Sequence, residues 1–299
     1  MADGGAAYGA PDRPESRTQR IVRKLSRGPL HLVIIGVCLA WMTPTAGLFV
    51  SSLRTRSEIA TTGWWTAFVP PLEFTLENYQ HVLTARGMGQ SFINSVMISV
   101  PATLFTIIVA ALAAYAFSWI EFRGREALFL VVVALLVVPI QLTLIPVLRM
   151  YAGLGMTGTF PAVWLAHTAY GLPFAVFLLR NFFIALPKDL LESAYLEGAS
   201  HFVAFTRIVM PLSVPALAAL GIFQFLWLWN DLLVALIYLG GFRDVAPMTV
   251  TISSLVSSFG SEWHLLTSAA FVSMVLPLIV FFALQKYFVE GILAGAVKG

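Results

Sequence analysis

The sequence predicts an all-α integral membrane protein with six transmembrane helices. Of its 299 residues, 59% are hydrophobic and only 11% are charged, whereas about 25% of the residues in a soluble domain are charged. Six stretches are long and apolar enough to cross a bilayer, and the segments between them alternate in their content of Lys and Arg. Together these three observations exclude an ordinary soluble domain.

Each predicted span contains about 20 or more mostly apolar residues, the length that a helix needs to cross the hydrocarbon core. Asp231 is the one acidic side chain well inside a span. Several spans contain proline, which a helix bundle tolerates because neighbouring groups take up the freed backbone atoms. The six spans are residues 30–51, 92–120, 127–149, 160–180, 208–239 and 265–287.

The distribution of positive charge predicts the orientation, because cytoplasmic segments carry an excess of Lys and Arg. Six basic residues precede the first span, and the 121–126 turn and the 181–207 loop carry others. We therefore expect a flexible basic cytoplasmic tail (1–29), a transmembrane domain (30–288) and a cytoplasmic C-terminal tail (289–299). The first apolar run is too long for a signal-peptide core, which predicts an uncleaved first span.

No motif in the sequence predicts catalysis or a bound cofactor. Residues 153–158, GLGMTG, match the dinucleotide fingerprint G-x-G-x-x-G, but that fingerprint needs a βαβ unit and these residues lie between two membrane spans. We interpret their glycines as turn residues. The chain lacks the phosphate loop G-x-x-x-x-G-K-[ST], so it is not expected to hydrolyse ATP. We also expect no metal site, because the histidines lie in different elements: His31, His81, His167, His201 and His264.

A compact polar segment, ESAYLEGAS (192–200), interrupts the apolar sequence between the fourth and fifth spans. Pro187 suits the first turn of a helix, and apolar residues recur at helical spacing over 190–195. Gly198 then offers a helix stop or a close backbone approach. The pattern predicts a short amphipathic helix, which either docks into a groove of a soluble partner or lies flat on lipid.

The loop 186–211 resembles the EAA loop of ABC importer permeases, whose pattern is E-A-A, then a glycine, then I-x-L-P. The matching residues here are Glu192-Ser193-Ala194, Gly198-Ala199 and Ile208-Val209-Met210-Pro211. Ser193 and Met210 are mild departures from the pattern, and Glu197 stands where Asp is frequent. Four further segments are similar to the carbohydrate-importing branch, especially to maltose- and α-glucoside-type second permease subunits: FTLENY (74–79), NS (94–95), WND (229–231) and GAVKG (295–299).

The resemblance implies a non-catalytic permease subunit in a bacterial cytoplasmic membrane. Its implied partners are a homologous permease, two ATPase subunits that hold ATP and Mg²⁺, and an extracellular or periplasmic sugar-binding protein. No nucleic acid is implied. The loop helix would dock on an ATPase, with Glu192 as its polar contact and Pro211 fixing the turn into the fifth span. The full set of implied coupling residues is Glu192, Ser193, Ala194, Glu197, Gly198, Ala199 and Pro211.

Aromatic and amide side chains near the end of the fifth span are candidates for a sugar path, because an ionisable group within a span is a functional candidate. In a continuous helix Asp231 would lie ~36 Å from Arg207, near the external surface. Such an interfacial position would explain Asp231 and the tryptophans without a substrate, so both interpretations remain open. The candidates are Gln224, Trp227, Trp229, Asn230 and Asp231.

Two alternatives remain for the function. An ion-coupled secondary transporter usually has buried carboxylates or broken helices near the midplane, and Asp231 alone does not supply them. An importer permease for a non-sugar substrate would also carry an EAA loop. The resemblance therefore predicts a sugar importer, with a di- or oligosaccharide such as an α-glucoside, maltose or trehalose as substrate.

Overall fold

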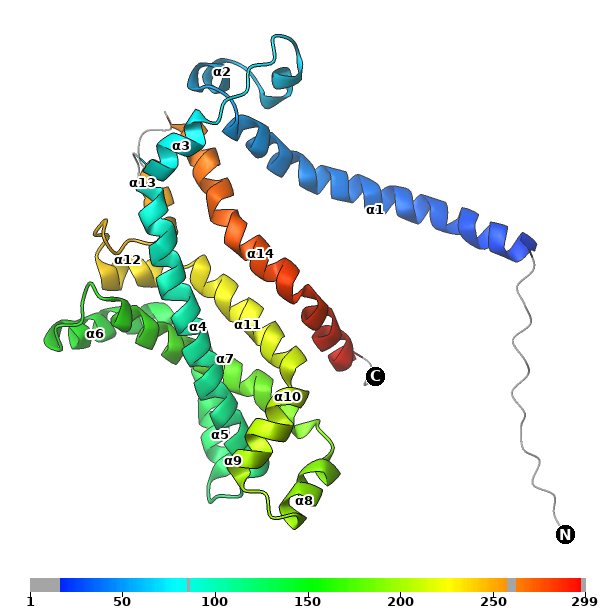
Figure 1. Cartoon of the computed structure of the whole chain (residues 1–299), viewed down its shortest axis with the longest axis vertical. Helices are drawn as coiled ribbons and strands as arrows, with labels where there is room; N and C mark the ends of the chain where they lie inside the picture. The colour runs from blue at the N-terminus through cyan, green and yellow to red at the C-terminus, as the bar shows by residue number, and fades with distance from the viewer. Residues whose placement is uncertain (1–16, 85–86, 257–261, 297–299) are drawn as a thin grey trace.

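A computed structural model of the chain describes residues 17–84, 87–256 and 262–296, with backbone alone for 17–27 and 288–296. Regular structure in these ranges is entirely helical (Figure 1). The longer helices are α1 (Arg17–Ser52), α4 (Met88–Trp119), α5 (Arg125–Ala134), α6 (Ile140–Gly153), α7 (Phe160–Ile184), α11 (Val214–Trp229) and α14 (Trp263–Ala296). The shorter ones are α2 (Arg56–Thr61), η1 (Trp64–Phe68), α3 (Glu77–Thr84), η2 (Leu135–Val137), α8 (Lys188–Leu196), α9 (His201–Ala204), η3 (Phe205–Val209), α10 (Met210–Leu212), α12 (Leu233–Leu239) and α13 (Met248–Val256).

Four helices are long and apolar enough to cross a membrane unbroken, and they match the first, second, fourth and sixth predicted spans. They are Gly28–Ser52 within α1, Met88–Trp119, Phe160–Ile184 and Trp263–Tyr287 within α14. Helix α1 begins inside the predicted N-terminal tail, and α14 continues beyond the predicted sixth span. Residues 1–16 and the last three residues of GAVKG lie outside the described residues.

The third predicted span is not a straight helix. Residues 125–137 and α6 meet at an angle of 99°. Pro139 stands at the break, and Val138 before it has extended backbone angles (φ −75°, ψ 117°). A residue that precedes proline is disfavoured in the helical region, and proline itself cannot donate a backbone hydrogen bond. The prediction of one continuous helix over 127–149 was therefore wrong, although its apolar composition was read correctly.

The fifth predicted span is broken at two places. Residues 201–212 and α11 meet at 75°, and α11 ends at Trp229 before the separate helix α12 begins at Leu233. The ~36 Å separation of Arg207 and Asp231 assumed a single helix, and that assumption is wrong because the helix is broken between them. Pro211 lies just before the first break, where the helix also widens into a π-helical turn over η3.

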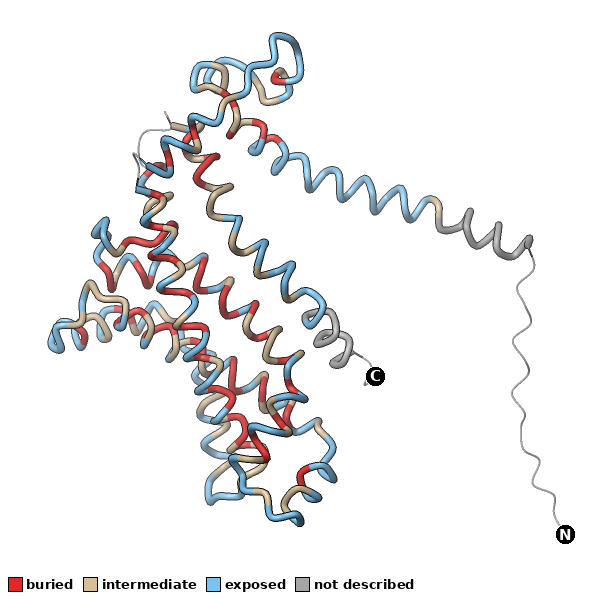
Figure 2. Tube along the Cα trace, viewed as in Figure 1, coloured by how far each residue is buried: buried red, intermediate tan, exposed pale blue. Residues whose placement is uncertain are grey.

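Short helices and turns gather at the two ends of the bundle. The 121–126 turn, α8 and α9 lie together at one end, called the α8 end, and α2, α3 and α13 lie at the opposite end (Figure 1). Helices α4 and α7 run together through the centre, where Figure 2 shows most of the buried residues. Helix α1 leaves the bundle, and only 11% of its span is buried, so Figure 2 shows it as exposed along most of its described length.

Candidate functional site

The polar segment of the loop 186–211 forms the predicted short helix, α8, which begins directly after Pro187. One face is held against the bundle: Leu191 is only 2% exposed and belongs to the cluster formed by α4, α7 and α11. Leu196 on another face is 90% exposed. Leu190, which was expected on the apolar face, is also exposed, because the bundle lies on the side of Leu191. The helix therefore contacts the bundle through a narrow face around Leu191, and the rest of its surface points outward.

Glycine ends α8 in the manner that the sequence predicted. Gly198 has a positive φ of 88°, a conformation that favours residues without a Cβ. The backbone N–H of Gly198 donates to the Tyr195 carbonyl at 3.0 Å, and that of Ala199 donates to the Ala194 carbonyl at 2.9 Å. This pair of bonds is a Schellman motif. Apart from its chain neighbours, no atom of this chain lies within 4 Å of the place where a Cβ on Gly198 would be, so within the chain it is the backbone conformation that calls for glycine.

The predicted coupling residues surround this helix end. Glu192 and Ser193 are exposed, as are Glu197 and Gly198, whereas Ala194 and Ala199 are half-buried. The Ser193 hydroxyl donates to the Asp189 carbonyl at 2.7 Å. The Glu192 carboxylate makes no hydrogen bond or ion pair with the described part of the chain, so it is free to meet a partner. Pro211 lies apart from α8, at the bend into α11.

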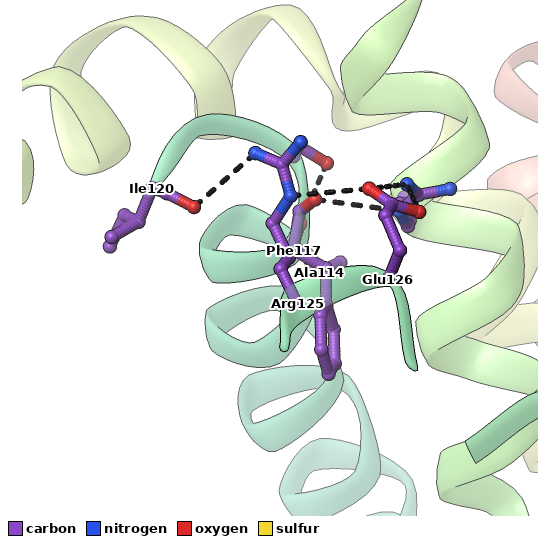
Figure 3. A network of polar contacts seen from close by, with 7 residues as sticks. Ala114, Phe117, Ile120, Arg125 and Glu126 are labelled. Carbon is purple, nitrogen blue, oxygen red and sulfur yellow. Dashed lines mark hydrogen bonds and ion pairs between the residues drawn. The ribbon is translucent and has the colours of Figure 1, made fainter. Parts of the chain in front are cut away.

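Two further groups of polar contacts hold the α8 end together, and the sequence signalled neither group. Tyr195 of α8 contacts Tyr115 of α4 and His201 of α9 through their polar atoms. On the other side, Arg180 of α7 donates to both carboxylate oxygens of Glu126 at 3.1 and 3.0 Å. Arg125 reaches the Glu126 carboxylate and the Ile120 carbonyl (Figure 3). These bonds join α5 to the ends of α4 and α7.

A cavity of about 380 Å³ lies between α6, α7 and α11. Two of the five candidate path residues, Gln224 and Trp227, line it. All of its lining side chains are uncharged, and four are aromatic. Gln224 donates weakly to the Thr106 hydroxyl of α4 at 3.4 Å. The lining residues are Ile140, Tyr170, Gly171, Phe174, Phe223, Gln224 and Trp227.

The other three candidate path residues lie elsewhere. Trp229 is buried against Phe92 and Phe225, and its indole N–H donates to the Ser273 carbonyl at 3.0 Å. Asn230 is exposed and donates to the Leu226 carbonyl at the end of α11. Their adjacency in the sequence therefore does not bring them to one surface.

The Asp231 side chain hydrogen-bonds the backbone at the start of the next helix, α12. Its carboxylate accepts hydrogen bonds from the backbone N–H groups of Val234 and Ala235 at 3.2 and 2.9 Å, which satisfies the free donors at the start of α12. The same carboxylate lies 3.5 Å from Nε2 of His167, a fully buried side chain on α7. The His167 ring also lies edge-on to Trp227. Asp231 thus connects the break after α11 to α7.

The FTLENY and NS segments have structural roles at the opposite end of the bundle. Asn78 donates to the carbonyls of Ser52 and Arg54 at 2.9 and 2.8 Å, where α1 ends. Asn94 donates to the carbonyls of Asp244 and Ala246, each at 3.0 Å, and so holds the loop between α12 and α13 on α4. Both asparagines are buried. Each asparagine therefore hydrogen-bonds backbone carbonyls that lie at or beyond the end of a helix.

A bundle of apolar spans that presents a short polar helix at one end and carries an open, uncharged pocket on its side fits the membrane-embedded part of a transporter. The chain belongs to the family of binding-protein-dependent transport system inner membrane components, whose model matches residues 103–293. It is therefore a multi-pass membrane component of an ABC transporter and not an ATPase subunit. Family membership confirms the resemblance drawn from the loop 186–211.

Curated relatives cover almost the whole chain. It is 57% identical over 286 residues to the osmoprotective compounds uptake permease protein GgtD of Synechocystis sp., covering 95% of this chain and 96% of that protein. It is 39% identical to the alpha-glucoside transport system permease protein AglG of Rhizobium meliloti, covering 91% of this chain and 98% of that protein. A crystal structure of a bacterial ABC transporter for alginate import has the same fold, with a TM-score of 0.74 and 21% identity over 92% of this chain and 99% of the other.

Proposed function

We propose that this chain is a permease subunit of an ATP-driven importer for a neutral sugar, a di- or oligosaccharide such as an α-glucoside, maltose or trehalose. The observation that carries the proposal is the geometry of α8. It stands on the bundle through Leu191 and leaves the Glu192 carboxylate exposed and free of partners. A short exposed helix of this kind fits a groove on a soluble partner, and family membership makes an ATPase subunit that partner.

The alternative in which α8 lies flat on lipid is disfavoured by its charges. The exposed charged residues are Lys188, Asp189 and Glu192 in α8 and Glu197 just after it, so acidic residues outnumber basic ones three to one. Membrane-surface helices typically carry Lys and Arg on their polar face to meet anionic headgroups. In a docked helix, Glu192 would face a basic or amide group of the ATPase, and the small residues Ser193, Ala194, Gly198 and Ala199 would permit close approach. Pro211, at the bend into α11, would fix the direction of the following span.

A second, homologous permease subunit would complete the pore. Helix α1 supports this proposal, because its apolar side chains are exposed around most of its described length and it packs on α14 only near its C-terminal end. Two ATPase subunits holding ATP and Mg²⁺ would bind at the α8 end. An extracellular or periplasmic sugar-binding protein would bind at the opposite end. Among solved relatives of the fold, the alginate transporter has been captured with an alginate pentasaccharide-bound periplasmic protein.

The proposed orientation places the α8 end and both termini in the cytoplasm. The basic residues before the first span and the arginines of the 121–126 turn support it through the positive-inside rule. The opposite end, with α2, α3 and α13, would then face the binding protein. Acidic and basic residues are mixed in its loops, as is usual on the external side.

The uncharged cavity supports a neutral, hydroxyl-rich substrate. Aromatic faces and an amide, here Trp227, Tyr170 and Gln224, suit a sugar, which offers apolar ring faces and many hydroxyls. The volume of about 380 Å³ falls in the range of small-molecule sites. Asp231 and Asn230 would act indirectly, through the ends of α11 and α12.

A second substrate class has its own support. The relative that shares 57% identity is named for the uptake of osmoprotective compounds, and a neutral osmoprotective compound rich in hydroxyls would suit the same uncharged lining. The two substrate classes would share one transport mechanism.

Affinity purification of the tagged chain from its native membrane, followed by mass spectrometry, tests the assembly. A second permease and an ATPase with a phosphate loop are expected to co-purify. The ATPase activity of that complex is then measured with its binding protein and a panel of sugars. Stimulation by α-glucosides or small neutral glycosides supports the proposal, whereas stimulation only by amino acids or charged sugars would contradict it.

A further inference from the structure

Three polar atoms from three helices meet at the α8 end. The hydroxyl oxygens of Tyr195 (α8) and Tyr115 (α4) lie 3.0 Å apart. Nδ1 of His201 (α9) lies 3.1 Å from the Tyr195 hydroxyl and 3.3 Å from the Tyr115 hydroxyl. We call this arrangement the Tyr–Tyr–His triangle. It joins the loop helix to a span that is 80 residues away in the sequence.

Two kinds of contact attach α8 to the bundle, and the hydrogen bonds of the triangle are the ones that depend on direction. Leu191 and Tyr195 lie one helical turn apart, on the same face. Leu191 packs in the apolar cluster of α4, α7 and α11, but apolar contact is non-directional and permits sliding. Hydrogen bonds between fixed aromatic rings, by contrast, demand a defined distance and angle. The rings are themselves held edge-on: His201 lies 5.2 Å from Tyr195 and 6.2 Å from Tyr115 between ring centroids.

The span reached by the triangle leads to the cavity. Tyr115 is 5% exposed and lies on α4. Thr106 lies nine residues earlier on the same continuous helix, about 13 Å along its axis. The Thr106 hydroxyl accepts the hydrogen bond from Gln224, which lines the cavity. A rigid helix therefore connects the attachment point of α8 to the wall of the cavity.

We propose that the Tyr–Tyr–His triangle is a positioning link that carries the movement of α8 to α4, and through Thr106 and Gln224 to the cavity. This inference rests on the proposed function, because it takes α8 as the helix that an ATPase subunit moves. Without the triangle, α8 stays attached by its chain connections and by Leu191, but its displacement no longer pulls α4 directly. ATP hydrolysis then continues while less substrate crosses per ATP.

The test uses the complete complex in proteoliposomes and measures substrate taken up per ATP hydrolysed. Tyr115→Phe and Tyr195→Phe each remove one hydroxyl and keep the ring, so the apolar packing is preserved. Each is expected to lower the ratio by about three- to tenfold, the effect of losing one hydrogen bond at a coupling step. The double variant should fall no further than the more affected single variant, because both changes break one unit.

Tyr79→Phe is the matched control. It removes a tyrosine hydroxyl that contacts the Ser52 hydroxyl at 2.7 Å at the opposite end of the bundle, and its ratio should equal that of the wild type. If the triangle only stabilises the fold, the yield of assembled complex falls but the ratio per complex is unchanged, and the inference is overturned. If the wild-type complex shows no ATP-driven uptake at all, the proposed function fails and takes this inference with it.

Discussion

Gln224 fills the space that a side chain on Gly171 would need. A Cβ at position 171 would lie 2.5 Å from Nε2 of Gln224 and 2.9 Å from its Cδ. The glycine on α7 thus allows the buried amide on α11 to sit between the helices, beside the cavity that both residues line. The same amide reaches Thr106 on α4, so three spans meet around one side chain.

Gly171→Ala is expected to force Gln224 out of its position. Because the contact is with the flexible end of Gln224, which can turn into the cavity, the expected cost is that of the lost contact with Thr106, about 0.5–1.5 kcal/mol. Thermal unfolding of the purified complex should shift downward, and the KM for substrate should change if Gln224 faces the transport path. Adding Gln224→Ala restores the space, so the double variant should regain most of the stability lost by Gly171→Ala. Additive losses would contradict the close approach.

Glu192→Lys is expected to uncouple uptake from ATP hydrolysis or to release the ATPase subunits. The change reverses an exposed carboxylate that has no partner in the described part of the chain, so the subunit itself should fold and insert normally. Replacing one side of an interfacial charge pair costs about 2–5 kcal/mol, and uptake should fall at least tenfold. Glu73→Lys, at an exposed glutamate before α3 at the opposite end, is the matched control for co-purification of the ATPase subunits. Normal co-purification of the ATPase and normal uptake with Glu192→Lys would contradict a docking role for Glu192.

Gly198→Ala is expected to weaken the end of α8 through its backbone. A non-glycine residue at a φ of 88° costs about 1–2 kcal/mol, and open space around the position excludes a steric cause. Gly198→Asn should be tolerated better, because asparagine adopts left-handed conformations more readily. Uptake per assembled complex is the measurement. Equal loss with Ala and Asn would indicate that size at an interface matters more than conformation.

Asp231 offers a choice between a structural and a transport role. Asp231→Ala removes the cap of α12 and should lower stability by about 0.5–2 kcal/mol. Asp231→Asn keeps an oxygen acceptor but not the charge beside His167. Near-normal uptake with Asn indicates that the side chain acts as a cap. A large loss of uptake with Asp231→Asn at unchanged thermal stability would contradict the capping role and would indicate a role in transport.

Apolar composition was sufficient to predict that the chain crosses the membrane, but not the direction of each helix. The run 127–149 is apolar on both sides of Pro139, so hydropathy alone does not distinguish a straight span from two helices at 99°. Proline signalled the break, yet prolines inside α4, α7 and α14 leave those helices continuous. Whether a proline bends a span depends on packing that a single sequence does not contain.

The loop helix was predictable because its signals are local. Pro187 before it, Gly198 after it and helical spacing between them fixed its bounds. The partners of Tyr195 and Asn94 were not predictable, because both contact residues that are far away in the sequence. Trp229 shows the same limit: its neighbours on α4 and α14 decide that it packs inward.

Uptake by proteoliposomes that contain the co-purified complex tests the central claim most directly. The binding protein and labelled sugar are supplied on one side, and ATP with Mg²⁺ on the side of α8. Accumulation that requires ATP, stops with a non-hydrolysable analogue and does not respond to a collapsed ion gradient is the predicted result. Accumulation driven by an ion gradient without ATP would contradict the account and would identify a secondary transporter.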